Sequence, residues 1–338
     1  MKSALRTEYG PPDVIQIKEV EKPVPADDQV LVKVFAASLN RTDWYDLNPP
    51  LFIRMISGGG IRKPKNRFLG GDIAGKVEAV GEDVSRLKPG DEVFGISSQG
   101  LSEYTCARES GLAIKPSNLS FEQASAVPIA AITALQGLRD KGRIQTGQKV
   151  LVHGASGSVG TFAVQIAKSF GGEVTAVCST KNVDSVRSLG ADKVIDYTQE
   201  DFTKSGEKYD LIIEVNGYRS ILTFRRALTP GGTFVMIGSS RIITALLQSL
   251  ILGPLLSRTG KKKMAFFMAK VNPADLTTLK QLIEAGRVKP FIDKEYSLYE
   301  IADAYRYLGE GHARGKIVVD ICNGSKAVGR RAVTSDTG

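Results

Sequence analysis

The chain has 338 residues, of which 42% are hydrophobic and 24% charged, and its formal net charge at pH 7 is +9. This composition is typical of a folded globular protein and excludes a fibrous or largely disordered chain, and the length suffices for two compact domains. The positive charge is concentrated at 54–67, 261–263 and 326–331. Because no RNA-binding motif or basic helix interleaved with aromatic residues accompanies it, we expect no nucleic-acid partner.

Three cysteines, Cys106, Cys178 and Cys322, lie far apart in the chain. Because they form no closely spaced pair, we expect free thiols in a reducing compartment, the cytoplasm. The chain passes almost directly into a predicted strand at 2–7, with no apolar signal segment before it. Residues 242–256 are apolar but too few to span a membrane, so a buried helix or a lid is favoured over peripheral membrane contact.

The first 115 residues are predicted to form short strands that are separated by turns. Strands are expected at 2–7, 14–20, 29–38, 72–80, 92–95 and 103–106. Pro-Gly-Asp at 89–91 marks one of the turns. Between residues 48 and 72 we expect a long loop without regular structure, and loops of such length are usually functional or mobile.

From residue 120 onward, the pattern changes to helices that alternate with strands. Ser120 and Gln123 form a capping box, which predicts a helix that runs to about Asp140 and is interrupted at Pro128. Strands follow at 149–153, 173–178, 192–196, 210–215 and 233–238. Because each is apolar nearly throughout, we expect a parallel sheet that is covered on both faces.

The C-terminal part is predicted to contain an edge strand, two helices and a last strand. The edge strand at 263–270 could pair across a two-fold axis, so we expect a homodimer. The helices are expected near 275–285 and 298–308, and the last strand at 316–321. Residues 323–338 are predicted to be a disordered tail.

The most informative stretch is the glycine-rich turn after the predicted strand 149–153. Gly154, Gly157 and Gly160 lack a Cβ, so the backbone can adopt a positive φ and approach a ligand closely. The first N–H groups of the following helix favour an anion such as a pyrophosphate. Together with a second strand about 20 residues later, this pattern is the dinucleotide-binding fingerprint of a Rossmann fold. The residues that we expect to contact the dinucleotide here are Ser156, Gly157, Ser158 and Val159.

The residues after the second strand favour NADP(H) over NAD(H). An Asp or Glu there would bond the ribose 2′-hydroxyl of NAD, but residues 178–182 are Cys-Ser-Thr-Lys-Asn. Hydroxyls, an amide and a cation suit a 2′-phosphate, which assigns Ser179, Lys181 and Asn182 to it. Tyr197, at the end of the third strand, is expected to cover the adenine ribose phosphate. The alternative is that Lys181 is a solvated lysine and that Asn182 only caps the next helix.

Polar residues also follow the fourth and fifth strands of the predicted sheet. Asn216 follows the strand 210–215, and Gly238 and Ser239 lie at the end of 233–238. Ligands of open α/β sheets bind at the carboxyl ends of the strands. We therefore expect these three residues to contact the cofactor.

Several motifs resemble those of a known family. They are LGGDIAGKVEAVG at 69–81, PGDEV at 89–93, GASGSVGTFAVQIAK at 154–168, SLGAD at 188–192 and GKIVV at 315–319. In this order, over nearly the whole chain, they resemble the medium-chain dehydrogenase/reductase superfamily in its zinc-independent quinone-oxidoreductase branch. SLNRTDW at 38–44 and GHARGK at 311–316 are similar to the subgroup of mitochondrial reticulon-interacting and chloroplast-envelope reductases.

The resemblance implies an α/β chain with two domains and an active site in the cleft between them. A GroES-like, mainly-β domain would span 1–120 and be completed by 272–322, and an NADP-binding Rossmann domain would span 121–271. The resemblance also implies that Thr133 faces the nicotinamide. The further cofactor contacts that it implies are Arg314, Gly315 and Lys316.

The resemblance also bears on whether the protein needs a metal ion. A catalytic zinc needs three protein ligands and an open position. Related zinc alcohol dehydrogenases place Cys, His-Glu and Cys ligands where this chain has Asn40, Gly71-Asp72 and the neighbourhood of Pro128. The two histidines, His153 and His312, lie elsewhere in the sequence, and His153 is interpreted as a packed residue at a strand end. We therefore predict no metal requirement.

Without a Lewis acid, the site has no strong means of ionising an alcohol. Reduction of a quinone or a polarised C=C bond needs less activation of the substrate. Hydrogen-bond donors can stabilise the oxygen that gains charge. Asn40 is the first candidate for this contact or for one to the nicotinamide, and its alternative role is to cap a helix at 41–47. Tyr45 is a candidate proton donor, although packing is favoured for its ring. The sequence thus predicts an NADPH-dependent oxidoreductase of small-molecule quinones or enones.

Two alternative functions stay open. One is reduction of an enoyl thioester, in which the basic loop 54–67 would steer an anionic carrier, whereas its simpler interpretation is a solvated face. The other is a cofactor-binding scaffold with little turnover.

Overall fold

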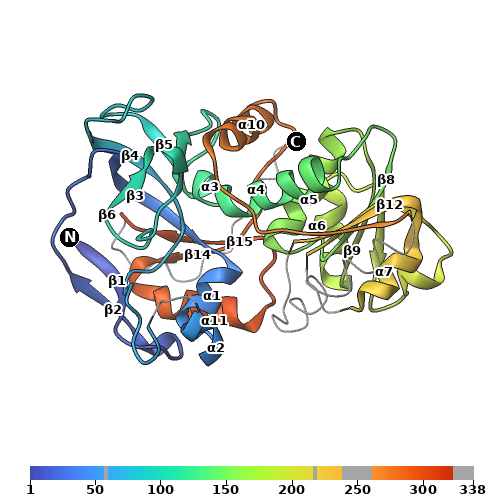
Figure 1. The fold of residues 1–338 in the computed structure, drawn as a ribbon, viewed down its shortest axis with the longest axis horizontal. Helices are drawn as coiled ribbons and strands as arrows, with labels where there is room; N and C mark the ends of the chain where they lie inside the picture. Colours follow the sequence, from blue (N-terminus) through green and yellow to red (C-terminus); the bar gives the residue numbers. More distant parts are fainter. Residues whose placement is uncertain (57–59, 216–218, 238–260, 323–338) are drawn as a thin grey trace. The chain divides into compact units, whose positions relative to one another are not determined.

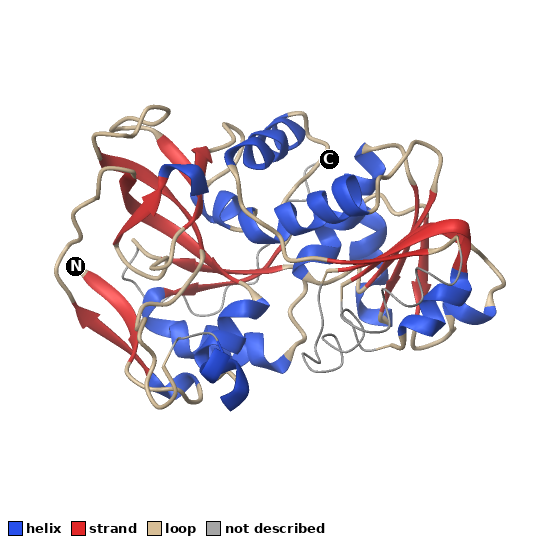
Figure 2. Cartoon of the chain, in the orientation of Figure 1, coloured by secondary structure: helices blue, strands red, loops and turns tan. Residues whose placement is uncertain are grey.

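The structure is a computed structural model that describes residues 1–56, 60–215, 219–237 and 261–322 (Figure 1). The chain divides into two compact units. The first comprises Met1–Ile129, Val271–Glu284 and Pro290–Gly338, and the second comprises Ala130–Lys270 and Ala285–Lys289. In the described part of the first unit more residues lie in strands than in helices, whereas helices and strands alternate in the second unit (Figure 2).

The first unit is built on a seven-stranded mixed sheet in which six strands follow the order β14-β15-β3-β4-β5-β7 and β6 pairs with β3. The strands are β3 (Gln29–Leu39), β4 (Asp72–Val80), β5 (Glu92–Ile96), β6 (Tyr104–Arg108), β7 (Leu112–Ile114), β14 (Ile292–Ser297) and β15 (Lys316–Asp320). β15 pairs antiparallel with β3 and parallel with β14. The C-terminal strand therefore completes a sheet that begins near the N-terminus.

A separate hairpin and several helices surround this sheet. They are the strands β1 (Lys2–Arg6) and β2 (Ile15–Glu19) and the helices α1 (Arg41–Leu47), α2 (Leu51–Ile56), α3 (Phe121–Ser125), α10 (Pro273–Glu284) and α11 (Ile301–Glu310). Helix α3 packs against β3, β4, β5 and β15. These contacts place α3 in the first unit.

The second unit is a parallel six-stranded sheet with the order β10-β9-β8-β11-β12-β13. Its strands are β8 (Lys149–His153), β9 (Glu173–Cys178), β10 (Lys193–Asp196), β11 (Tyr209–Glu214), β12 (Leu228–Met236) and β13 (Lys263–Phe266). The central strands β8, β9 and β11 are buried at nearly every residue. Because consecutive residues of a strand point to opposite faces, both faces of this sheet are covered.

The helices of the second unit are α4 (Pro128–Gln136), which begins in the first unit, α5 (Ser158–Ser169), α6 (Val183–Ser188) and α7 (Ile221–Ala227). Helix α5 packs on β8 and β9, α6 on β9 and β10, and α7 on β12. The parallel βαβ arrangement therefore brings the carboxyl ends of β8 and β9, and the turns that follow them, to one edge of the sheet.

Several sequence predictions are confirmed to the residue. The strands expected at 72–80, 149–153 and 173–178 and the helix at 41–47 have these bounds in the structure. The capping box is also present, since Ser120 Oγ accepts the N–H of Gln123 and Gln123 Oε1 accepts the N–H of Ser120.

One prediction is wrong: part of the segment between 48 and 72 is helical. Helix α2 begins after Pro49-Pro50, and the N–H groups of Ile53 and Arg54 both donate to the carbonyl of Pro50. The fixed φ of proline is compatible with the first turn of a helix, so the proline pair begins the helix and does not extend the loop.

The apolar segment, the C-terminal tail and the homodimer remain predictions. The segments 242–256 and 323–338 lie outside the described residues. β13 forms the edge of its sheet, but homodimer formation through it is still to be measured. No helix in the described part of the chain is long and apolar enough to cross a membrane.

Candidate functional site

The glycine turn of the second unit begins where β8 ends. Gly154 has a φ of +84°, a conformation that L side chains rarely adopt. The N–H groups of Gly154 and Ala155 both donate to the carbonyl of Val177, at 3.2 and 3.1 Å. The turn is therefore fastened to the end of the neighbouring strand β9.

The other two glycines meet different requirements. A Cβ at Gly160 would lie 2.1 Å from the carbonyl oxygen of Gly154, so the close contact between turn and helix requires glycine there. A Cβ at Gly157 would approach no atom of the turn closer than 3.6 Å, and its φ is −81°. The protein's own packing therefore does not require glycine at 157; the position is the N-cap of α5, where glycine is favoured, and it also leaves room for a ligand to approach.

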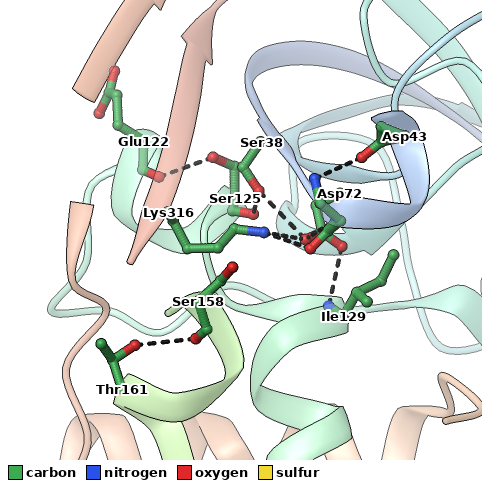
Figure 3. Close-up of polar contacts among 10 residues, drawn as sticks. Ser38, Asp43, Asp72, Glu122, Ser125, Ile129, Ser158, Thr161 and Lys316 are labelled. Atoms are coloured by element: carbon green, nitrogen blue, oxygen red, sulfur yellow. Dashed lines mark hydrogen bonds and ion pairs between the residues drawn. The ribbon is translucent and has the colours of Figure 1, made fainter. Parts of the chain in front are cut away.

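Helix α5 begins directly after this turn. Ser156, Gly157, Ser158 and Val159 are all partly exposed, and Thr161 Oγ1 donates to the carbonyl of Ser158 at 3.0 Å (Figure 3). The first N–H groups of a helix have no partner within it and attract an anion. The residues expected to bind the dinucleotide therefore form one turn whose N–H groups suit a diphosphate.

The end of β9 is joined to the same turn through Asn182. Its side chain is buried, and its Nδ2 donates to Ser156 Oγ and to Ser179 Oγ, at 3.1 Å each. Its Oδ1 is buried without a hydrogen-bond partner among the described residues. The structure thus brings Ser156, Ser179 and Asn182 together, while Lys181 is exposed. Tyr197 is 47% exposed, and its N–H donates to the carbonyl of Cys178.

The remaining expected cofactor contacts are distributed over both units. Thr133 is buried in α4, in the second unit. In the first unit, the N–H of Arg314 donates to Asp293 Oδ2, and Gly315 has a φ of +89°. Asn216, Gly238 and Ser239 lie outside the described residues.

The first unit holds a buried ion pair between Lys316 and Asp72. Both side chains are fully buried, and Lys316 Nζ lies 3.0 Å from Asp72 Oδ2 and 2.7 Å from Asn40 Oδ1 (Figure 3). Asn40 Nδ2 in turn donates to Asp72 Oδ2 at 2.9 Å. The three side chains therefore form a closed triangle of hydrogen bonds, which we call the buried triad.

The triad is held by strands that are remote in sequence. Asn40 directly follows β3, Asp72 begins β4 and Lys316 begins β15, and β3 pairs with both other strands. Asp72 Oδ1 also accepts the N–H of Ile129, at 3.0 Å. Both oxygens of this buried carboxylate are therefore hydrogen-bonded, which offsets the cost of removing its charge from water.

The triad changes the interpretation of two residues. The ammonium of Lys316 is bound within the first unit by Asn40 and Asp72, and the contact with the cofactor that the resemblance implies for this residue stays a prediction. Asn40 is the N-cap residue of α1 and forms a capping box with Asp43: its backbone N–H donates to Asp43 Oδ2 at 2.6 Å, and its carbonyl accepts the N–H of Asp43. The amide of Asn40 is in addition hydrogen-bonded to both members of the ion pair.

Asp43 lies close to this charged group in an environment that disfavours ionisation. Burial raises the pKa of its carboxyl from 3.8 to about 7, against the lowering effect of the Asn40 N–H, and the charge of Asp72 raises it further. The positive charge of Lys316 lowers the pKa of Asp43. Tyr45, the candidate proton donor, lies on α1 with Asp43. The guanidinium of Arg41 lies over the ring of Tyr45, at 5.3 Å from the ring centroid.

A buried contact between an imidazole and a carboxylate lies in the second unit, where the sequence predicted only a packed histidine. His153 ends β8, and its Nδ1 is 2.8 Å from Oε2 of Glu214, which ends β11. The imidazole also contacts the rings of Phe202 and Phe224, at centroid distances of 5.7 and 5.3 Å. His153 is therefore both packed and paired with a carboxylate.

Comparisons with known proteins agree with this architecture. A family profile described as "Alcohol dehydrogenase GroES-like domain" matches residues 26–128, and one described as "Zinc-binding dehydrogenase" matches residues 189–319. The quinone-oxidoreductase QR1 of Triphysaria versicolor is 32% identical over 325 residues, covering 90% of this chain and 94% of the relative. The chain belongs to the medium-chain dehydrogenase/reductase superfamily, in its quinone-oxidoreductase branch. The predicted family is therefore confirmed.

Another relative and a solved structure extend the comparison. The NADPH-dependent alkenal/one oxidoreductase of Arabidopsis thaliana is 33% identical over 334 residues, covering 94% of this chain and 79% of the relative. The quinone oxidoreductase of Coxiella burnetii has a TM-score of 0.83 at 29% identity and covers 95% of this chain and 99% of its own. The predicted fold class, a GroES-like domain plus a Rossmann sheet, is confirmed.

The buried triad makes a prediction about stability. Lys316→Met leaves a carboxylate buried without its cation, and Asp72→Asn leaves an ammonium without its anion, so we expect each to lower the free energy of unfolding by about 3–5 kcal/mol. The double variant should lose less than the sum of the two, because it leaves no lone buried charge. Urea unfolding of the four proteins measures this coupling, and additive losses would contradict it.

The environment of Asp43 makes a prediction about pH. Its pKa rises from 3.8 to about 7 on folding, so the folded state holds the proton more tightly. Ionisation therefore costs stability, and this cost grows as the pH rises from about 4 to about 7 and is constant above. Asp43→Asn cannot ionise but keeps an oxygen for the N–H of Asn40. We expect its stability relative to the wild type to increase across this pH range, as measured by urea unfolding.

The control for this measurement is Asp27→Asn, which changes an exposed aspartate of the same unit. Its stability relative to the wild type should vary little with pH. If the Asp43→Asn difference were equally independent of pH, or decreased as the pH rises, the stated environment of Asp43 would be wrong.

Proposed function

We propose that this protein reduces quinones or α,β-unsaturated carbonyl compounds with NADPH and without a metal ion. The proposal is supported by the names of its relatives, which include a 2-methylene-furan-3-one reductase of Solanum lycopersicum and a quinone oxidoreductase of Homo sapiens. The observation that carries its metal-free chemistry is the ammonium of Lys316 between Asn40 and Asp72.

The donor set of the triad does not fit a catalytic zinc. At two of the positions where zinc alcohol dehydrogenases have ligands, Asn40 and Asp72 provide one amide and one carboxylate, and both are bonded to the same ammonium. Gly71 has no side chain that could bind a metal ion. No cluster of three His, Cys, Asp or Glu residues with metal-binding geometry occurs in the part of the chain that the structure describes. Lys316 thus supplies a positive charge where those enzymes would bind a cation.

The triad suggests how an oxygen could be stabilised without zinc. Asn40 is 6% exposed, and one hydrogen-bond donor of its amide is used by Asp72. We propose that the second amide proton donates to the carbonyl oxygen of the acceptor, where negative charge develops. Because the amide is held on both sides, it needs no reorientation when that charge forms. Water or Tyr45 would then supply the proton.

The turn of the second unit fits a dinucleotide. When bound, NADPH supplies the hydride. The turn from Ser156 to Val159 would hold the diphosphate, through the first N–H groups of α5 at Ser158 and Val159, while Ser179 and Lys181 would bind the 2′-phosphate. Asn182 would position the two serines, because its Nδ2 is bonded to both. Thr133, Tyr197, Arg314 and Gly315 remain proposed cofactor contacts, as do Asn216, Gly238 and Ser239.

Enoyl-thioester reduction is the second candidate. The trans-enoyl reductase pgmF of Aspergillus terreus is 34% identical over 318 residues, covering 87% of this chain and 86% of the relative. The CurK enoyl reductase has a TM-score of 0.80 at 28% identity, covering 94% of this chain and 98% of its own. The same hydride chemistry and the same oxygen contact would serve such a substrate, so the distinction depends on the acceptor.

The acceptor is tested by the rate of NADPH oxidation with panels of quinones, enones and enoyl thioesters. We expect turnover of the first two classes to have the higher kcat/KM. Turnover of the thioesters alone would replace the proposal with the second candidate. Tight NADPH binding with no turnover of any acceptor would favour a scaffold role.

Cofactor choice is tested by Lys181→Glu. The substitution places a carboxylate where we expect the 2′-phosphate, so the Kd for NADPH should rise about tenfold or more while that for NADH stays nearly unchanged. Titration calorimetry measures both constants. Lys204→Glu changes the net charge equally at another exposed lysine of the same unit and should leave both unchanged. Tighter binding of NADH than NADPH by the wild-type protein would overturn the assignment.

A further inference from the structure

Three large apolar side chains are exposed around helix α2 and in the loop that follows it. Leu51, Met55 and Ile61 are 59%, 63% and 55% exposed. Leu51 and Met55 are one helical turn apart, so they lie on the same face of α2. Isolated exposed apolar residues are common, but a group of them marks a surface that contacts something else.

The loop after α2 is held close to the helix by Tyr9. The guanidinium of Arg54, on α2, lies 4.2 Å from the centroid of the Tyr9 ring. The hydroxyl of Tyr9 donates to the carbonyl of Gly60, at 2.9 Å. Because Ile61 follows Gly60 directly, it belongs to the same local surface as the helix.

The same surface carries a high density of positive charge. Arg62, Lys63, Lys65 and Arg67 are all exposed, and the sequence contains no acidic residue between Asp46 and Asp72. Some exposed lysines elsewhere do have an acidic partner, such as Lys193 with Glu207. No carboxylate among the described residues forms an ion pair with any of the four cations. We call these four cations and the three apolar side chains the cationic-apolar patch.

We propose that the cationic-apolar patch binds the surface of an anionic lipid membrane. Each lysine and arginine near such a surface adds to the electrostatic attraction, and aliphatic side chains enter the boundary between headgroups and acyl chains. Nucleic-acid sites combine cations with groups that bond or stack on bases, whereas the uncharged members of this patch are aliphatic. The combination of aliphatic groups with unpaired cations therefore favours lipid.

This surface goes beyond the proposed reaction and does not depend on it. Binding to lipid would occur without NADPH or an acceptor. If the proposed reaction is correct, the same surface would bring the protein to quinones that are dissolved in the lipid phase. Vesicle binding and turnover of a water-soluble acceptor therefore test the two proposals separately.

The test is sedimentation of the full-length protein with vesicles of phosphatidylcholine, with and without phosphatidylglycerol. We expect binding only to the anionic vesicles, decreasing with added salt because the charges are screened. The variant Arg62→Glu/Lys63→Glu/Lys65→Glu should lower the partition coefficient about 100-fold or more. It should keep its activity on a water-soluble acceptor, which shows that it is folded.

A matched control separates the patch from net charge. Lys18→Glu/Lys76→Glu/Lys88→Glu reverses three exposed lysines of the same unit and changes the net charge by the same amount. We expect this variant to bind vesicles nearly as well as the wild type. An equal loss of binding in the two triple variants would overturn the proposal, and so would failure of the wild type to bind the anionic vesicles.

The apolar contribution is tested by Leu51→Ser/Met55→Ser/Ile61→Ser. If the side chains enter the lipid, this variant loses vesicle binding although all its cations remain. Unchanged binding would contradict insertion. Fluorescence anisotropy with a labelled DNA duplex tests nucleic acid as the alternative partner. Tighter binding to DNA than to vesicles through the same cations would overturn the choice of lipid.

Discussion

The buried pair of Lys316 and Asp72 is the interaction on which the first unit and its proposed chemistry both depend. It joins the first residue of β15 to the first residue of β4, 244 positions apart, through a contact of 3.0 Å. A lone buried charge costs several kcal/mol, so each partner requires the other. The pair also fixes the amide of Asn40, and the same network thus stabilises the sheet and orients the group proposed to contact the acceptor.

In the proposed reaction, the second unit binds the cofactor and the first unit contacts the acceptor. The second unit supplies a turn in which Gly154 and Gly160 are required by backbone geometry and packing, while Gly157 leaves space that a ligand can fill. The first unit supplies an amide held by an ion pair. One unit therefore suits a charged cofactor, and the other suits an uncharged, polarised acceptor, which is the combination that hydride transfer to a carbonyl-activated bond needs.

The sequence predicted local features well because they depend on neighbouring residues. The turn at 154–160 and the strands at 72–80 and 149–153 follow from glycine spacing and apolar runs. The triad depends on the register between β3, β4 and β15, which no local pattern contains. The available signal was a charged residue at the first position of each strand, Asp72 in β4 and Lys316 in β15. The pairing of His153 with Glu214 was missed for the same reason.

We propose that the protein supports the reaction with its own side chains and without a metal ion, and that the ammonium of Lys316 is the cation of the triad. The most direct measurement is the rate of NADPH oxidation with a quinone before and after dialysis against a zinc chelator, with zinc measured in the same samples by elemental analysis. The account predicts far less than one zinc per chain and an unchanged rate. A rate that is lost on dialysis and restored by added zinc would contradict it.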